Sequence, residues 1–150
     1  MKIAILGNGG REHALALSIS KSKKVQKIFC LPGNAGTAKI AENILLNVNN
    51  FELIYDFLKK NQIDLVIVGP EKPLVNGIVN YLKKRNISVF GPNKNSAQLE
   101  GSKIFTKKIC KKYKIPTASF GIFKSKKSAI KFVNKSKLPI VIKADGLAAG

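Results

Sequence analysis

Short apolar runs alternate with amphipathic stretches along the first part of the chain, and the longer runs end in turns that contain glycine or proline. Runs of this length, bounded by such turns, are typical of strands buried on both faces of a parallel sheet. Stretches with apolar residues three and four apart are typical of helices packed on a core. The pattern predicts strands over residues 2–6, 25–31, 44–46, 64–68 and 87–90, and helices over residues 11–21, 51–60 and 74–85.

Strand, glycine turn and helix follow one another repeatedly up to about residue 92. This order predicts an α/β fold with a doubly wound parallel sheet. Asn50 is expected to cap the helix FELIYDFLKK, since asparagine is a preferred N-cap residue. The predicted strands end in the loops GNGGRE, LPGNAG, GPEKPL and GPNKN. Loops at the carboxyl ends of strands are where open α/β sheets bind ligands.

The pattern changes after residue 93. Residues 96–100 are expected to form a short helical turn, and Ser102 to cap the basic helix KIFTKKICKKYK. A strand near 118–121, a helix over 126–135 and a strand over 139–143 complete the prediction. We therefore expect a first domain over residues 1–101 and the beginning of a second over 102–150, which is too short to complete a compact domain of the usual size.

The chain is strongly basic, with 27 Lys and Arg against 8 Asp and Glu and a formal net charge of +19. Such a balance can indicate nucleic-acid binding. Only Arg11 and Arg85 are arginines, however, and the lysines are spread along the chain. We expect small anionic ligands rather than a nucleic-acid partner, and keep a basic RNA-binding protein as the weaker alternative. The absence of a long apolar run and of a secretory signal leads us to expect a cytoplasmic protein without a membrane partner.

The first glycine-rich loop, Gly7-Asn8-Gly9-Gly10, follows a strand and opens a helix, as loops that bind phosphate do. The dinucleotide fingerprint requires a glycine where Glu12 stands, and an acid at the end of the second strand, where the chain has Leu31-Pro32-Gly33. Both tests fail, so NAD binding is disfavoured. A sugar phosphate or another monophosphate stays possible, as does a glycine turn that only allows tight packing.

Three charged residues stand where they could contact a ligand. Arg11 could bind a phosphate with its two-pronged guanidinium, or could simply face solvent. Glu71 could accept hydrogen bonds from substrate hydroxyls, or could stabilise a helix N-terminus. Lys143 follows an apolar run and precedes the loop Asp145-Gly146-Leu147-Ala148-Ala149-Gly150, as a lysine aimed at nucleotide phosphates would, although an ordinary strand-ending lysine fits equally well. This loop does not match a Walker motif.

Six stretches together resemble one enzyme family: GNGGREHALA, PGNAGT, VGPEKPLVNGIVN, FGPNKNSAQLEGSKIFTK, IPTASF and VIKADGLAAG. They are similar, in order and over residues 1–150, to the phosphoribosylamine–glycine ligases, also called glycinamide ribonucleotide synthetases, of the ATP-grasp superfamily. LEGSK and KADGLAAG are the most specific of them. A small departure at residues 95–97, where the family more often has alanines, should alter only a helix cap.

The resemblance implies a purine-biosynthesis ligase. Such an enzyme uses ATP to join glycine to 5-phosphoribosylamine through glycyl phosphate, giving glycinamide ribonucleotide. It implies an N-terminal α/β domain of the pre-ATP-grasp type followed by the start of an ATP-grasp α+β domain. It also implies a requirement for Mg²⁺ or Mn²⁺, with metal ligands beyond residue 150. The sequence leaves the oligomeric state open, and we expect a monomer. The family enzyme is roughly three times longer, so we expect an N-terminal fragment that is inactive alone, and keep a non-catalytic sugar-phosphate-binding or nucleotide-binding module as the alternative.

The resemblance also assigns residues. Lys103 and Lys143 would bind ATP phosphates, and the residues from Asp145 onward would begin a mobile flap over them. The full set of expected ATP-binding residues is Lys103, Lys143, Asp145, Gly146, Leu147, Ala148, Ala149 and Gly150. The resemblance places Gly9, Gly10, Asn34 and Glu71 on the side of the ribose phosphate, and the chemistry of the guanidinium adds Arg11 to this set. No catalytic residue is assigned, and the spacing of the acids indicates no metal site.

Overall fold

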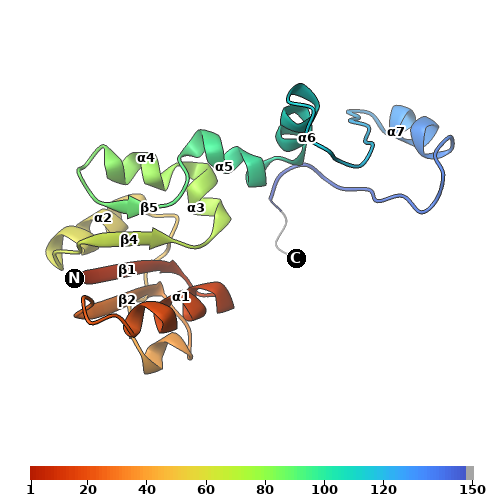
Figure 1. The fold of residues 1–150 in the computed structure, drawn as a ribbon. Helices are drawn as coiled ribbons and strands as arrows, with labels where there is room; N and C mark the ends of the chain where they lie inside the picture. The colour runs from red at the N-terminus through yellow and green to blue at the C-terminus, as the bar shows by residue number, and fades with distance from the viewer. Residues whose placement is uncertain (148–150) are drawn as a thin grey trace. The chain divides into compact units, whose positions relative to one another are not determined.

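The computed structural model describes residues 1–147, which form two compact units that divide between Ala97 and Gln98 (Figure 1). The first unit contains a five-stranded sheet in the order β3-β2-β1-β4-β5, and every pair of neighbouring strands is parallel. The predicted α/β fold with a doubly wound parallel sheet is thereby confirmed. The strands are β1 (Lys2–Gly7), β2 (Lys27–Pro32), β3 (Glu42–Asn43), β4 (Leu65–Val68) and β5 (Val89–Phe90).

Helices cover both faces of this sheet, as a parallel sheet requires. Helix α1 packs on one face, and the helices that follow β3 and β4 pack on the other (Figure 1). The helical elements of the first unit are α1 (Gly10–Ser20), the short 3₁₀ helix η1 (Thr37–Lys39), α2 (Phe51–Lys60), α3 (Glu71–Asn76) and α4 (Ile78–Lys83). The predicted cap of α2 is confirmed, because the side chain of Asn50 accepts a hydrogen bond of 3.2 Å from the Leu53 N–H.

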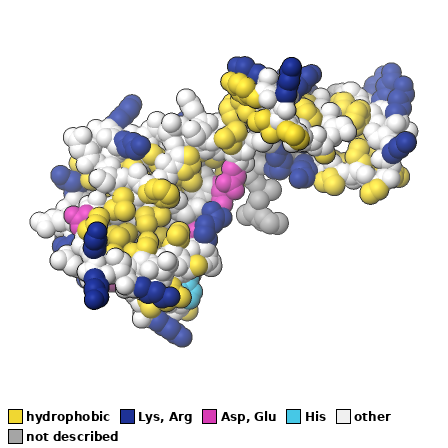
Figure 2. All heavy atoms as spheres, in the orientation of Figure 1, with side chains coloured by type: hydrophobic (Ala, Val, Ile, Leu, Met, Phe, Trp, Pro, Cys, Tyr) yellow, Lys and Arg dark blue, Asp and Glu magenta, His cyan; other side chains and the backbone are white. Residues whose placement is uncertain are grey.

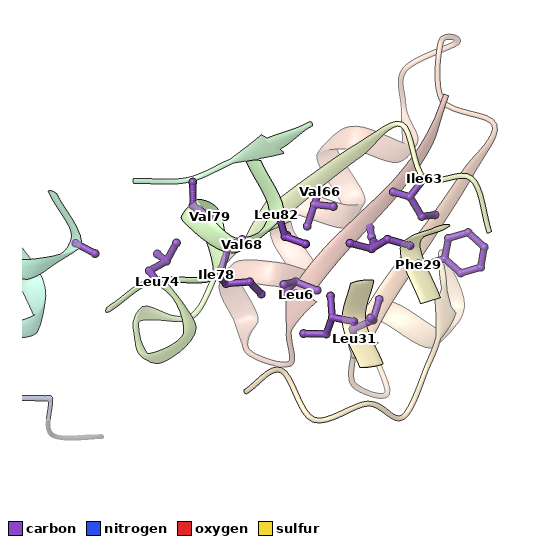
Figure 3. Close-up of a cluster of buried hydrophobic side chains, with 14 residues drawn as sticks. Leu6, Phe29, Leu31, Ile63, Val66, Val68, Leu74, Ile78, Val79 and Leu82 are labelled. Atoms are coloured by element: carbon purple, nitrogen blue, oxygen red, sulfur yellow. The ribbon is translucent and has the colours of Figure 1, made fainter. Parts of the chain in front are cut away.

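The larger core lies between the sheet and helices α2, α3 and α4 (Figure 3). Alternate residues of each central strand point into it, so Leu6 of β1 lies with Leu31 of β2 and Val66 of β4, and Leu82 of α4 closes over them. The intervening residues of the same strands, such as Ile5, face α1. Both faces of β1 are therefore buried, which explains why its sequence is a continuous apolar run.

The helix predicted over residues 74–85 differs in the structure. It begins earlier, at Glu71, and Gly77 divides it into α3 and α4. Gly77 has φ of 97°, a left-handed backbone conformation that ends α3. Residues other than glycine adopt this conformation only at a cost in free energy. The edge strands also differ, since β3 pairs through Glu42 and Asn43 rather than through residues 44–46.

The second unit contains α6 (Lys103–Lys112) and α7 (Lys126–Val133), and α5 (Lys94–Gly101) spans the division. Ser102 caps α6, as predicted, by accepting from the Phe105 N–H. The strands predicted near 118–121 and over 139–143 are wrong, because the described part of this unit contains no strand. Val141 and Ile142 are 76% and 79% exposed. An apolar run forms a strand only where a neighbouring strand can pair with its backbone N–H and C=O groups.

On the visible face of the first unit, Lys and Arg side chains stand apart from one another around an apolar area (Figure 2). Within residues 1–147, no helix combines the length and apolar character needed to cross a membrane.

Candidate functional site

The predicted ligand loops of the first unit meet where the direction of the chain connections reverses. The chain runs from β1 outward to β2 and β3 on one side, and then returns to place β4 and β5 on the other side. The carboxyl ends of β1 and β4 therefore flank the switch point of the sheet, which is where open α/β sheets bind ligands. The β1 loop (residues 7–10) and the β4 loop (residues 69–71) lie at this position.

Arg11 connects the two loops. Its Nη1 donates to the carbonyl oxygen of Gly69 at 2.8 Å, and its Nη2 donates to Oε1 of Glu71 at 2.7 Å. This hydrogen bond holds the pKa of the Glu71 carboxyl below its usual range, because it stabilises the ionised form. The structure thus brings together two predicted ligand-binding residues that lie sixty positions apart in the sequence.

Glu12 fills the space between the same loops. It is only 5% exposed, and its Oε2 accepts from the Gly9 N–H at 2.7 Å. A Cβ atom added to Gly7 or to Gly69 would lie 2.7 Å or 2.6 Å from Cδ of Glu12, closer than real contacts allow. The carboxyl group is therefore surrounded by the backbone of glycine residues.

Asn34 connects the β2 loop (residues 33–37) to the β1 loop. Its Nδ2 donates to the carbonyl oxygens of Asn8, at 2.9 Å, and of Gly9, at 3.2 Å. Its Oδ1 accepts from the N–H groups of Gly36 and Thr37. In this structure the Asn34 side chain orders two loops that border the switch point.

The two glycines predicted to contact a phosphate differ in their surroundings. The Gly9 N–H donates to the Glu12 carboxyl group. The Gly9 carbonyl oxygen accepts from the Asn34 side chain and from the His13 N–H. Gly10 opens α1, is exposed, and has open space where a side chain would be. The open side of the β1 loop is therefore the side of Gly10 and Arg11.

A second group of predicted residues meets within the second unit. Lys103 Nζ donates to the carbonyl oxygen of Gly146 at 2.6 Å. The carboxylate of Asp145 accepts from the Ser102 hydroxyl and from the Ile104 N–H, each at 3.1 Å. The hydrogen bond from Ile104 and the hydroxyl of Ser102 both lower the pKa of Asp145. The loop before residue 147 is thus attached to the first turn of α6.

The remaining expected ATP-binding residues are not gathered there. Lys143 and Leu147 are exposed, and Ala148, Ala149 and Gly150 lie outside the described residues. Within residues 1–147 no three His, Cys, Asp or Glu side chains are grouped in a way that could hold a metal ion. The described acids therefore do not fit the Mg²⁺ or Mn²⁺ that the resemblance implies.

Glu12 and Ser102 contribute to these groups in ways that were not predicted. In the sequence, Glu12 stands out only as the residue that breaks the dinucleotide fingerprint. Its position three residues after Gly9, in the first turn of a helix, is the capping-box spacing that predicts a side chain turned back to the N-cap backbone. Ser102 was expected to cap α6, and it also donates to a carboxylate that lies forty-three residues away.

Family models match the whole chain in two parts. Residues 1–100 match "Phosphoribosylglycinamide synthetase, N domain", and residues 101–150 match "Phosphoribosylglycinamide synthetase, ATP-grasp (A) domain". Among curated proteins, the phosphoribosylamine–glycine ligases of Clostridium acetobutylicum and Escherichia coli K12 are 49% and 47% identical over all of this chain. The chain spans 36% and 35% of these relatives, or about a third of their length.

Solved structures agree with this similarity. The phosphoribosylamine–glycine ligase of Thermotoga maritima has a TM-score of 0.75 and 33% identity over 98% of this chain and 34% of its own. The biotin carboxylase domain of Hydrogenobacter thermophilus 2-oxoglutarate carboxylase, solved with MgADP, ADP and bicarbonate, has a TM-score of 0.68 over 92% of this chain and 33% of its own. At 20% identity, the second similarity shows the fold alone.

Proposed function

This chain belongs to the phosphoribosylglycinamide synthetase family, and from that premise we propose that it provides the sugar-phosphate side, and the start of the ATP side, of a ligase that joins glycine to 5-phosphoribosylamine. In the proposed reaction the γ-phosphoryl group of ATP moves to a glycine carboxylate oxygen, giving glycyl phosphate and ADP. The amine of phosphoribosylamine then attacks the carbonyl carbon. A C–N bond forms, phosphate leaves, and the amine loses a proton.

The observation that carries the sugar-phosphate assignment is the arrangement of Arg11, Glu71 and Gly69 at the switch point. Arg11 has a side chain that is 60% exposed and Glu71 one that is 30% exposed, so a ligand can reach both. A guanidinium suits a phosphate, and an ionised carboxylate accepts hydrogen bonds from ribose hydroxyls. Gly9, Gly10 and Asn34 would border the same ligand through the β1 and β2 loops.

On the ATP side, we propose that Lys103 and Lys143 bind phosphate oxygens and that the loop from Asp145 to Gly150 covers them. An ammonium group has three donors, so Lys103 can keep its bond to the Gly146 carbonyl while it binds a phosphate. Asp145 would act by holding the loop against α6, because a carboxylate repels phosphate. A covering loop would also exclude water from the acyl phosphate. The divalent metal of the reaction would be held by residues beyond the described chain.

Calorimetric titration of the chain with ribose 5-phosphate and, separately, with ATP tests this assignment. We expect Glu71→Gln to weaken ribose 5-phosphate binding by about 10-fold or more, since a hydrogen bond to a charged group contributes about 1.5–3 kcal/mol. Lys143→Met should weaken only ATP binding, and Lys137→Met, at another exposed lysine, should change neither. Ribose 5-phosphate binding without ATP binding would instead support the sugar-phosphate module.

We further propose that the 150-residue chain makes no glycinamide ribonucleotide by itself, because it corresponds to about a third of the matched relatives. Incubating it with ATP, glycine, phosphoribosylamine and Mg²⁺ and measuring ADP and product checks this. Product formation above the rate without protein would contradict it.

A further inference from the structure

The buried carboxyl group of Glu12 has no place in the proposed chemistry, yet it lies between the two loops that flank the switch point. The residue is only 5% exposed, so its carboxyl group is almost entirely shielded from solvent. It is therefore not a ligand-binding group. A buried polar group is costly unless it is hydrogen-bonded, as Oε2 of Glu12 is to the Gly9 N–H. Its position between the two loops still needs a structural reason.

The glycines around Glu12 supply that reason. Gly9 has φ of −86°, an ordinary value that any residue adopts, and φ of Gly69 likewise lies outside the left-handed region. Backbone conformation therefore does not require glycine at either position. A Cβ on Gly9 would lie 2.9 Å from Oε2 of Glu12, and a Cβ on Gly69 would overlap Oε1 and Cδ. The Glu12 carboxyl group therefore occupies the space of a side chain at Gly69 and leaves little room for one at Gly9.

Gly69 is held from two directions by consecutive residues of α1. The Glu12 side chain lies against its α-carbon, and the Arg11 guanidinium donates to its carbonyl oxygen at 2.8 Å. Its own N–H donates to the carbonyl oxygen of Leu6 at 3.1 Å, which extends the β1–β4 ladder to the loop. The Glu12 carboxyl group thus lies in the space between the β1 and β4 loops.

We propose that Glu12 is a positioning residue of the sugar-phosphate site, whose buried carboxylate sets the spacing of the β1 and β4 loops, and that Gly9 and Gly69 lack side chains in order to accommodate it. Because Glu12 uses the Gly9 N–H, the ligand approaches the loop from the side of Gly10 and Arg11. The functional part of this inference rests on the proposed function, and the packing part does not.

A double-mutant cycle in thermal unfolding tests the packing part. Gly69→Ala should lower the Tm by more than about 8 °C in the wild-type background, because the added methyl group overlaps Glu12. With Glu12→Ala present, the same change should shift the Tm by less than about 4 °C. Gly10→Ala is the control for adding a methyl group, and should shift the Tm little because the space there is open. An equal loss from Gly69→Ala in both backgrounds would overturn the inference. If the Glu12→Ala chain does not fold, Glu12→Asp, which is one methylene shorter, replaces it in the same cycle.

Ribose 5-phosphate affinity, measured below the Tm of every variant, tests the functional part. Glu12→Ala should raise the Kd at least about 10-fold in the folded protein, and Glu12→Gln, which keeps the shape and an acceptor oxygen, should restore it to within about 3-fold. Asp56→Asn, which removes an exposed acid of α2, is the charge-matched control. A Glu12→Ala chain that has a lower Tm but an unchanged Kd would show that Glu12 is only structural, and would overturn the inference. A wild-type chain that does not bind ribose 5-phosphate would contradict the proposed function, while the double-mutant cycle would still decide how Glu12 is packed.

Discussion

At the scale of single residues, two neighbours in the first turn of α1, Arg11 and Glu12, contact the loops at the switch point. One is basic and exposed, and the other is acidic and buried. The Arg11 side chain reaches outward to Gly69 and Glu71, where solvent and a ligand can reach it. The Glu12 side chain turns back to the Gly9 N–H and is buried. The exposed residue is suited to bind a ligand and the buried one to hold the loops.

The pH dependence of stability should report the Arg11–Glu71 ion pair. The pKa of Glu71 is lowered in the folded state, so the pair stabilises the protein when the carboxylate is ionised, above its ordinary value of 4.5, and this stability is lost as the pH falls through the folded pKa. We expect Arg11→Met to reduce the free energy of unfolding by about 0.2–1 kcal/mol at pH 7, as exposed pairs do. The difference should shrink below pH 4.5.

Urea unfolding of both chains between pH 3 and pH 7 measures this effect. Arg85→Met is the control, because the Arg85 guanidinium lies 3.7 Å from the centre of the Tyr81 ring, which is a cation–π contact rather than an ion pair with a carboxylate. A difference between wild type and Arg11→Met that stays constant with pH would rule out the ion pair as its source.

At the scale of elements, side-chain caps decide where two helices begin, and backbone conformation decides where another ends. Asn50 and Ser102 cap α2 and α6 through bonds to residues three positions later. Gly77 interrupts an otherwise helical sequence with a left-handed residue, so α3 and α4 take separate directions. This break allows Glu71 to open α3 at the end of β4, while Ile78 and Leu82 of α4 pack in the core.

Gly77→Ala should therefore destabilise the first unit. A residue with a Cβ in the left-handed region costs about 1–2 kcal/mol, and the added methyl group would also lie 3.3 Å from Cδ of Lys94. Denaturant unfolding measures the loss. Gly10→Ala, at a helical glycine with open space around it, should change the stability by less than about 1 kcal/mol. Equal effects of the two changes would contradict the role given to Gly77.

At the scale of the whole molecule, burial is unevenly divided between the two units. The buried hydrophobic residues of the described chain all lie between Ile3 and Ala97. Helices α6 and α7 contain no buried residue. The first unit thus has a core of its own, whereas the described part of the second unit is held by hydrogen bonds within its helices and between α6 and the loop at Asp145 and Gly146.

Native-state hydrogen exchange should show this difference. Amides of β1 and β4 should exchange only through global unfolding of the first unit, whereas those of α6 and α7 should exchange much faster through local opening. A shortened chain of residues 1–97 should keep the protection pattern of β1 and β4 and the urea midpoint of the full chain. Protection of α6 as strong as that of β1, or loss of folding in the shortened chain, would contradict this division.

The sequence by itself determined the features that depend on neighbouring residues or on matching motifs. The apolar run of β1, the caps at Asn50 and Ser102, the parallel α/β fold and the resemblance to the family all follow from local pattern. Two strands of the second unit were predicted wrongly, because an apolar run such as Pro139–Ile142 indicates a strand only where another strand lies beside it. The sequence shows the run and not its neighbour.

Only the tertiary structure decided which residues meet. Arg11 and Glu71 are sixty positions apart, and they touch because β1 and β4 are adjacent parallel strands whose carboxyl ends lie together. The same adjacency places Gly69 against Glu12, a residue that the sequence had shown only as a departure from a motif. Periodicity describes which side of an element is apolar, but the pairing of strands determines which loops lie side by side, and that adjacency brings the residues of the candidate site together.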